Sequence, residues 1–170
     1  IMMRKIVVLL ALVIFQVGAA KAQIDVEEAK AKFIYNFTKF FEWPSSERNG
    51  DFVIGVIGSK EIYSELASYT KGKKVITQNI QVKYFKNAEE ASECHMVFVS
   101  KFRADELKGI HKKTGHYTLI VSDSVNGIKN GSALSFVLQG NRLRFMFSGD
   151  NALKLGLKYS SRIKEMAING

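Results

Sequence analysis

The sequence predicts a single α/β domain, folded as a three-layer α/β/α sandwich around a mixed, largely parallel sheet. Short apolar runs typical of buried strands alternate with stretches of helical spacing, the order that produces parallel βα units. Near the carboxyl end, two β-rich runs flank Gly140-Asn141, which predicts a late antiparallel hairpin. The chain has one proline and no repeat or flexible linker, so we expect one compact domain.

The first expected helix covers residues 25–42. Asp25 is a suitable amino-terminal cap, and acidic residues follow it in the first turn, where the helix dipole favours them. Four phenylalanines at helical spacing form one wide apolar face. Pro44 disfavours helical geometry in the residue before it, so we expect this helix to end near Trp43.

The remaining elements follow from apolar runs, alternation and helical spacing. We expect strands at residues 52–57, 80–85, 96–99, 117–121, 133–138 and 143–147, helices at 60–69, 103–113 and 150–167, and a short helix or turn at 87–93. This alternation predicts helices on both faces of the sheet.

The first 22 residues have the features of a secretory signal peptide. Two basic residues precede an apolar stretch from Ile6 to Val17, and Ala20-Lys21-Ala22 supplies small residues at the expected cleavage site. The apolar stretch has about a dozen residues, whereas a membrane-spanning helix needs about 20. We therefore expect a periplasmic protein with no stable membrane anchor, whose domain occupies residues 23–170.

The net charge of +9 at pH 7 is compatible with several kinds of partner. A basic domain suggests nucleic acid, but export argues against nucleic acid, and the lysines are scattered along the chain. Anionic headgroups, cell-wall polymers, an acidic protein partner or a simply solvated basic surface suit an exported protein better.

Cys94 is the only cysteine, which excludes a disulfide within the chain. It precedes an apolar run, so burial at the start of a strand is one expectation. Pairing with a second chain, in a homodimer, is the other.

The sequence contains no recognisable catalytic constellation, and we expect no enzyme, no cofactor and no metal. The three histidines lack zinc-type spacing, and hydrolase, zinc-protease and phosphate-loop motifs do not occur. Residues 55–59 follow a strand and precede a helix, but they lack the full glycine fingerprint and are more typical of a tight turn. Asp123 follows another buried strand, at the edge of the sheet where ligands often bind. It could belong to a ligand crevice or to a polar turn, and we favour the turn. A small-molecule receptor with its pocket at the sheet's carboxyl end is therefore the alternative function.

The aromatic density of the first helix is unusual. Six aromatic side chains lie between Phe33 and Trp43, more than one side of a helix usually buries. Core packing accounts for most of them. Tyr35 and Trp43 are the candidates to emerge at a partner-binding surface, where such side chains often anchor binding.

Two motifs near opposite ends of the domain also resemble those of a known family. Residues 32–44 (KFIYNFTKFFEWP) closely resemble the opening signature of the YfiR-like proteins, and residues 155–163 (LGLKYSSRI) are similar to the family's Gly-Leu-x-x-Ser-Ser-Arg-Leu ending. The best-known YfiR-like proteins are periplasmic repressors. They bind the periplasmic part of an inner-membrane diguanylate cyclase and hold it inactive, so that their release raises cyclic di-GMP and promotes biofilm.

The resemblance implies a regulatory binding protein that controls a membrane signalling protein, either a diguanylate cyclase or a histidine kinase. The sequence departs from the family pattern at two places. Some members carry two disulfides tied to redox control, whereas Cys94 is alone. Phe147-Ser148 stands where the family usually has Ile-Asn.

The closing motif suggests a structural clamp. Inside a helix, Ser160 and Ser161 could bond back to carbonyls one turn earlier, and a buried Arg162 would need a carboxylate such as Glu42 or Asp51. We expect this motif to join the last helix to the Trp-Pro turn, with ligand binding as the second interpretation. The residues concerned are Asn36, Ser160, Ser161 and Arg162.

Overall fold

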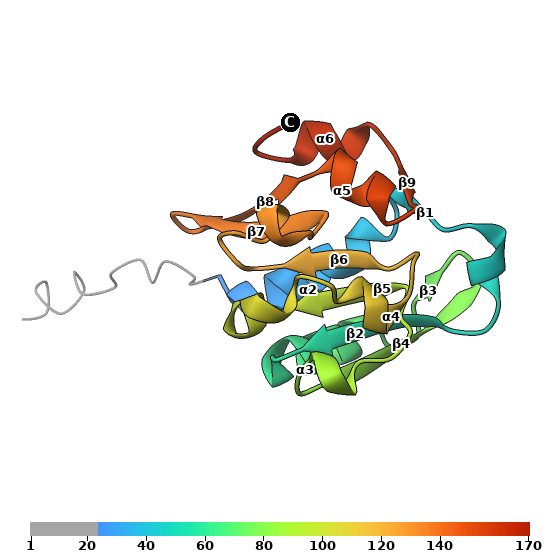
Figure 1. The fold of residues 1–170 in the computed structure, drawn as a ribbon. Helices are drawn as coiled ribbons and strands as arrows, with labels where there is room; N and C mark the ends of the chain where they lie inside the picture. The colour runs from blue at the N-terminus through green and yellow to red at the C-terminus, as the bar shows by residue number, and fades with distance from the viewer. Residues whose placement is uncertain (1–23) are drawn as a thin grey trace, which may run out of the picture.

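The computed structural model describes residues 24–170 (Figure 1), so the predicted signal peptide lies outside the described residues. In chain order the elements are α2 (Val26–Phe37), β1 (Phe41–Glu42), η1 (Ser45–Arg48), β2 (Phe52–Ile57), α3 (Lys60–Thr70), β3 (Lys74–Val75), β4 (Gln78–Phe85), η2 (Ala88–Glu90), β5 (Met96–Val99), η3 (Lys101–Glu106), α4 (His111–Thr114), β6 (Leu119–Ser122), η4 (Ile128–Asn130), β7 (Leu134–Gln139), β8 (Arg142–Phe147), α5 (Gly149–Lys154), β9 (Lys158–Tyr159) and α6 (Arg162–Met166). None of the helices within residues 24–170 has the length and apolar character needed to cross a membrane.

Seven strands form one sheet in the order β3-β4-β2-β5-β6-β7-β8. The five central strands run parallel to their neighbours, whereas β3 and β8 pair antiparallel at the two edges. The β7–β8 hairpin turns at Gly140, whose φ of 57° lies in the left-handed region that glycine tolerates best. The predicted mixed, largely parallel sheet with a late hairpin is confirmed.

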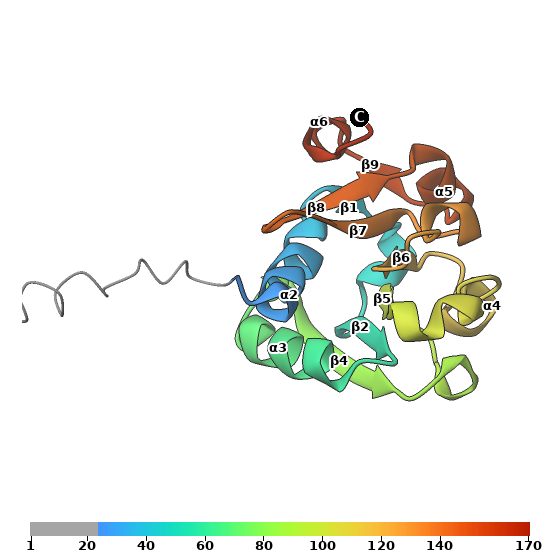
Figure 2. The ribbon, with the colours of Figure 1, turned by 90° about the vertical axis from the view of Figure 1, so that its left-hand side faces the viewer.

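Helices cover both faces of this sheet. Figure 2 shows α2 and α3 on one side of the central strands and α4 on the other, with the sheet curled so that β7 and β8 lean over α2. Every residue of β5 is fully buried, and Leu119, Ile120 and Val121 of β6 are at most 2% exposed. Strands buried on both faces are the mark of a sheet between two helical layers, and the α/β fold class is therefore confirmed.

Helix α2 begins where the sequence predicts. The Asp25 carboxylate accepts hydrogen bonds from the backbone N–H groups of Glu27 and Glu28, both at 3.1 Å. Further along, the Phe37 ring lies 5.0 Å from Phe145 in an edge-to-face arrangement, which packs the helix against β8.

The prediction that this helix continues to residue 42 is wrong. It ends at Phe37, where the Thr38 hydroxyl donates to the Tyr35 carbonyl at 2.6 Å. Phe41 and Glu42 then form β1, which pairs antiparallel with β9. Strand pairing and the burial of Phe41 against the Phe147 ring outweigh the local helical spacing of the aromatic residues.

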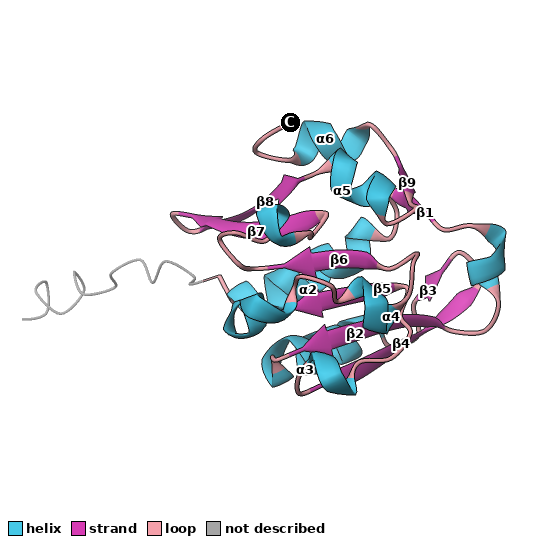
Figure 3. Cartoon of the chain, viewed as in Figure 1, coloured by secondary structure: helices cyan, strands magenta, loops and turns pink. Residues whose placement is uncertain are grey.

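Two other predicted helices are interrupted, as Figure 3 shows for the segment between α5 and α6. In place of a helix over 103–113, η3 and α4 are separated by Gly109, whose φ is 83°. In place of a helix over 150–167, α5 and α6 are separated by Gly156, with φ of 74°, and by β9. A left-handed residue ends a right-handed helix, so each glycine breaks the predicted run.

Candidate functional site

The outward side of α2 carries an apolar groove of about 390 Å³. It lies between α2 and the carboxyl-terminal helix α6, which come from opposite ends of the described chain. Its lining is mainly aromatic and aliphatic, with lysines at its edge, and consists of Ala29, Lys32, Phe33, Asn36, Phe37, Lys39, Phe40 and Met166. This groove is an accessible apolar part of the aromatic helix.

Packing beneath the groove fixes its shape. The half-buried Phe33 ring lies 6.0 Å from Phe136 and 5.9 Å from Phe145, so β7 and β8 support it from below. On the other side, Met166 of α6 is 43% exposed, while Ile163 of the same helix is fully buried. The sequence predicts neither Phe33 nor Met166 as a site residue, because only the fold brings α6 beside α2.

The edge of the groove is basic. Lys39 donates from Nζ to the Asn36 side-chain oxygen at 2.9 Å and lies 5.2 Å from the centroid of the Tyr35 ring. Lys32 is exposed two turns before Lys39 and pairs with Glu28. An apolar surface with an unpaired cation at its edge favours a partner segment that is apolar and carries an acidic residue beside that cation.

Tyr35, one of the two predicted anchors, is half-buried beside this groove and not among its lining residues. Its ring lies edge-to-face with Tyr69 of α3, with centroids 5.9 Å apart, and Lys73 Nζ lies 5.9 Å from its centroid. Tyr35 is accessible, but it belongs to the seam between α2 and α3.

Trp43, the other predicted anchor, lies in the core, and the expectation that its side chain is exposed is wrong. It is 6% exposed, and its Nε1–H donates to the carbonyls of His95 at 3.1 Å and Tyr117 at 3.0 Å. Its ring packs edge-to-face on Phe52, with centroids 4.8 Å apart. Trp43 therefore ties the turn after α2 to the amino-terminal ends of β2, β5 and β6.

The closing motif lies outside a helix interior, so the back-bonding expected of Ser160 and Ser161 does not apply. The Ser160 N–H donates to the Phe40 carbonyl at 2.9 Å, next to the β1–β9 pairing. Arg162 is exposed at the start of α6, and no ion pair joins it to a carboxylate within residues 24–170. Backbone hydrogen bonds join the closing segment to the end of α2, whereas the arginine is not a buried clamp.

Comparison with known families supports what these two motifs suggest. A family model described as YfiR/HmsC-like matches residues 27–168. The chain belongs to the YfiR/HmsC-like family. The match spans both α2 and α6, so the whole groove lies within the family domain. A search of curated proteins finds no match.

A buried ion pair crosses the carboxyl end of the sheet in this YfiR/HmsC-like domain. Lys30 of α2, 7% exposed, donates from Nζ to Asp123 at 2.8 Å and to Glu27 at 2.9 Å. Burial disfavours the ammonium, but these two hydrogen bonds and negative charges outweigh it and raise the pKa of Lys30. Asp123 also accepts a hydrogen bond from the Lys101 N–H at 2.6 Å. It therefore connects α2 to the segment after β5, at the edge of the sheet where the sequence suggested a turn or a ligand crevice.

Both ring nitrogens of His95 form hydrogen bonds to the backbone. Its Nδ1 accepts from the Val53 N–H at 3.0 Å, and its Nε2 lies 2.8 Å from the Glu47 carbonyl, which requires the proton on Nε2. In the described part of the chain, no group of three or more His, Cys, Asp or Glu side chains could hold a metal ion. The groove on α2 is thus the best-supported functional surface.

Proposed function

We propose that this chain is an exported regulatory protein that binds a membrane signalling protein from the periplasm and controls its activity. The partner is a diguanylate cyclase or a histidine kinase. Membership of the YfiR/HmsC-like family supports this proposal, because the family consists in general of periplasmic regulators of diguanylate cyclases, not enzymes. The apolar groove on α2, built largely from the family's opening motif, is the observation that carries it.

The groove is suited to an apolar helix or strand of the partner's extracytoplasmic domain. Phe33 and Phe40 provide half-buried aromatic surface, and Met166 provides a flexible apolar edge that adapts to different side chains. Lys39 at the edge favours an acidic residue beside that segment, whereas Lys32 already pairs with Glu28. Desolvated aromatic pockets of this kind contribute most of the free energy of binding in protein interfaces.

A matched pair of variants tests the surface. Met166→Glu places a carboxylate at the edge of the groove, whereas Leu153→Glu makes the same kind of change on α5, where Leu153 is 60% exposed. Both residues are exposed, Met166 by 43% and Leu153 by 60%, so both variants should keep the wild-type melting temperature. Met166→Glu should weaken binding of the partner's extracytoplasmic domain about thirtyfold, or about 2 kcal/mol, and Leu153→Glu should leave it unchanged.

The functional readout is the activity of the membrane protein. Cells that express wild-type chain together with its cognate cyclase should contain less cyclic di-GMP than cells with the cyclase alone, and Met166→Glu should abolish the difference. For a kinase partner, autophosphorylation replaces cyclic di-GMP as the readout. If the wild-type chain captures no membrane signalling protein from its own membranes, the proposal fails. If Met166→Glu binds as well as Leu153→Glu, the groove is not the interface.

A further inference from the structure

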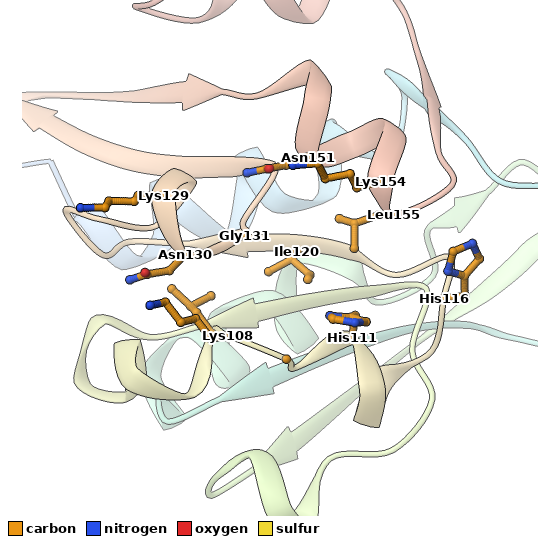
Figure 4. A pocket seen from close by; sticks show the side chains of 12 residues that line it. Lys108, His111, His116, Ile120, Lys129, Asn130, Gly131, Asn151, Lys154 and Leu155 are labelled. Carbon is orange, nitrogen blue, oxygen red and sulfur yellow. The ribbon is translucent and has the colours of Figure 1, made fainter.

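A second cavity lies on the face of the sheet that carries α4, away from the groove on α2 (Figure 4). Its volume is about 410 Å³, and it is lined by Ile120 of β6 and by residues from three other stretches of chain, 107–116, 129–131 and 151–155. Figure 4 places Lys108 and Asn130 on one side of it, His111 on the other, and Ile120 of β6 between them. A cavity of this volume is within the range of small-molecule sites.

The ionisable side chains around this cavity are all basic. Lys108, Lys129 and Lys154 come from three different segments, and His111 and His116 complete the set. No Asp or Glu occurs among the described residues that line it. Within residues 24–170, no carboxylate forms an ion pair with any of the three lysines. By contrast, the nearby Lys113 pairs with Glu89 at 3.2 Å.

The base of the cavity is apolar and rigid. Leu107, Ile120 and Leu155 are 1%, 2% and 7% exposed, respectively. Asn151 fixes the wall formed by α5, because its side-chain amide donates to the Ile128 carbonyl at 2.8 Å and to the Ser132 carbonyl at 2.9 Å. The site therefore exists without a ligand and needs little rearrangement to accept one.

We propose that this cavity binds a small organic anion, with a phosphate or carboxylate group at its basic rim and an apolar body on Ile120 and Leu155. Ammonium groups form strong charge-assisted hydrogen bonds to phosphate and carboxylate oxygens. Because no carboxylate pairs with these three exposed lysines within residues 24–170, an anionic ligand does not have to displace one, although water and salt reduce the attraction. This ligand site is separate from the partner-binding groove and does not depend on the proposed regulation of a membrane protein.

Phenyl phosphate is a suitable probe, because it joins a phosphate to an apolar ring, and phenol is its uncharged counterpart. Isothermal titration calorimetry should detect saturable binding of phenyl phosphate at millimolar concentrations or below, and no binding of phenol. Titration with benzoate separates phosphate recognition from carboxylate recognition. Binding of either anion supports the proposal, and binding of neither overturns it.

A triple variant, Lys108→Gln, Lys129→Gln and Lys154→Gln, tests whether the cavity is the site. The control triple, Lys60→Gln, Lys71→Gln and Lys86→Gln, removes the same charge from exposed lysines elsewhere. The cavity triple should weaken binding of the anion at least about tenfold, which is about 1.4 kcal/mol, while the control triple keeps wild-type affinity. Equal losses in both triples, or none in the cavity triple, would overturn the assignment. Melting temperatures of both triples establish that the fold is intact.

Discussion

Truncation of Trp43 should destabilise the fold severely, because its side chain is both core and hydrogen-bond donor. The indole is 6% exposed, packs edge-to-face on Phe52 and donates to two carbonyls of neighbouring strands. Removing a buried aromatic ring costs about 3–5 kcal/mol. For a domain of this size, such a loss corresponds to a fall in melting temperature of about 10 °C or more.

Two further variants separate the contributions of the ring and of the hydrogen bonds. Trp43→Phe keeps most of the apolar burial but leaves the His95 and Tyr117 carbonyls without their donor, at a cost of about 1–3 kcal/mol. Phe102→Ala removes an aromatic ring that is 78% exposed and should change stability by less than about 0.5 kcal/mol. Urea unfolding followed by far-ultraviolet circular dichroism measures all three, since Trp43 is the only tryptophan and its fluorescence is lost in both Trp43 variants. A loss below about 1 kcal/mol for Trp43→Ala would refute its place in the core.

Three other predictions concern titration, ion pairing and backbone geometry. Burial raises the pKa of the Cys94 thiol to about 12, so above about pH 9 the unfolded chain releases this proton and the folded chain retains it. The free energy of unfolding should then fall by up to about 1.4 kcal/mol per pH unit more steeply in wild type than in Cys94→Ala, and equal slopes would contradict this. Asp123→Ala should cost about 1.5–3 kcal/mol, because the buried Lys30 ammonium then keeps only Glu27 as its partner. Lys30→Met with Asp123→Leu should recover most of that loss in denaturant unfolding. Gly156→Ala should lower the melting temperature by several degrees, since φ is 74° and the added Cβ would lie 2.7 Å from the Tyr117 ring; an unchanged melting temperature would rule out this strain.

The sheet could be predicted from the sequence because its strands are buried on both faces. β2, β5 and β6 are short continuous apolar runs, and β7 and β8 flank a Gly140-Asn141 turn, so local composition alone identifies them. Helices were predicted less well where a glycine adopts positive φ. Gly109 and Gly156 occur inside stretches whose apolar spacing is helical, and only the tertiary structure determines that the chain breaks there.

The candidate site was predictable only in part. The excess of aromatic residues from Phe33 onward indicates an apolar surface on α2, and the groove lies on that helix. Asn36, which the sequence assigns to the clamp of the closing motif, lines this groove. The choice of Trp43 failed because its two carbonyl partners, on His95 and Tyr117, are more than fifty residues away in sequence. Met166 could not be predicted either, because no short-range sequence pattern shows that α6 lies beside α2.

The burial of Lys30 and the basic cavity could not be predicted from sequence patterns either. In the sequence, Lys30 belongs to no motif and has the features of a surface lysine. Its partner Asp123 lies 93 residues later in the chain, and only the fold places the two side chains 2.8 Å apart. The lysines of the cavity are scattered in sequence, so charge counting treats them as a solvated basic surface. Only the fold, which places the segment before α4, η4 and α5 around Ile120, brings them to one cavity.

Site-specific photocrosslinking tests most directly the claim that the chain acts by binding a membrane signalling protein through the α2 groove. A photoreactive amino acid replaces Asn36, which lines the groove, or Lys112, which is exposed on α4 across the sheet. After irradiation of intact cells, position 36 should crosslink to one diguanylate cyclase or sensor kinase of the inner membrane, whereas position 112 should not. Crosslinks from position 112 alone, or none to any membrane signalling protein from position 36, would contradict the account.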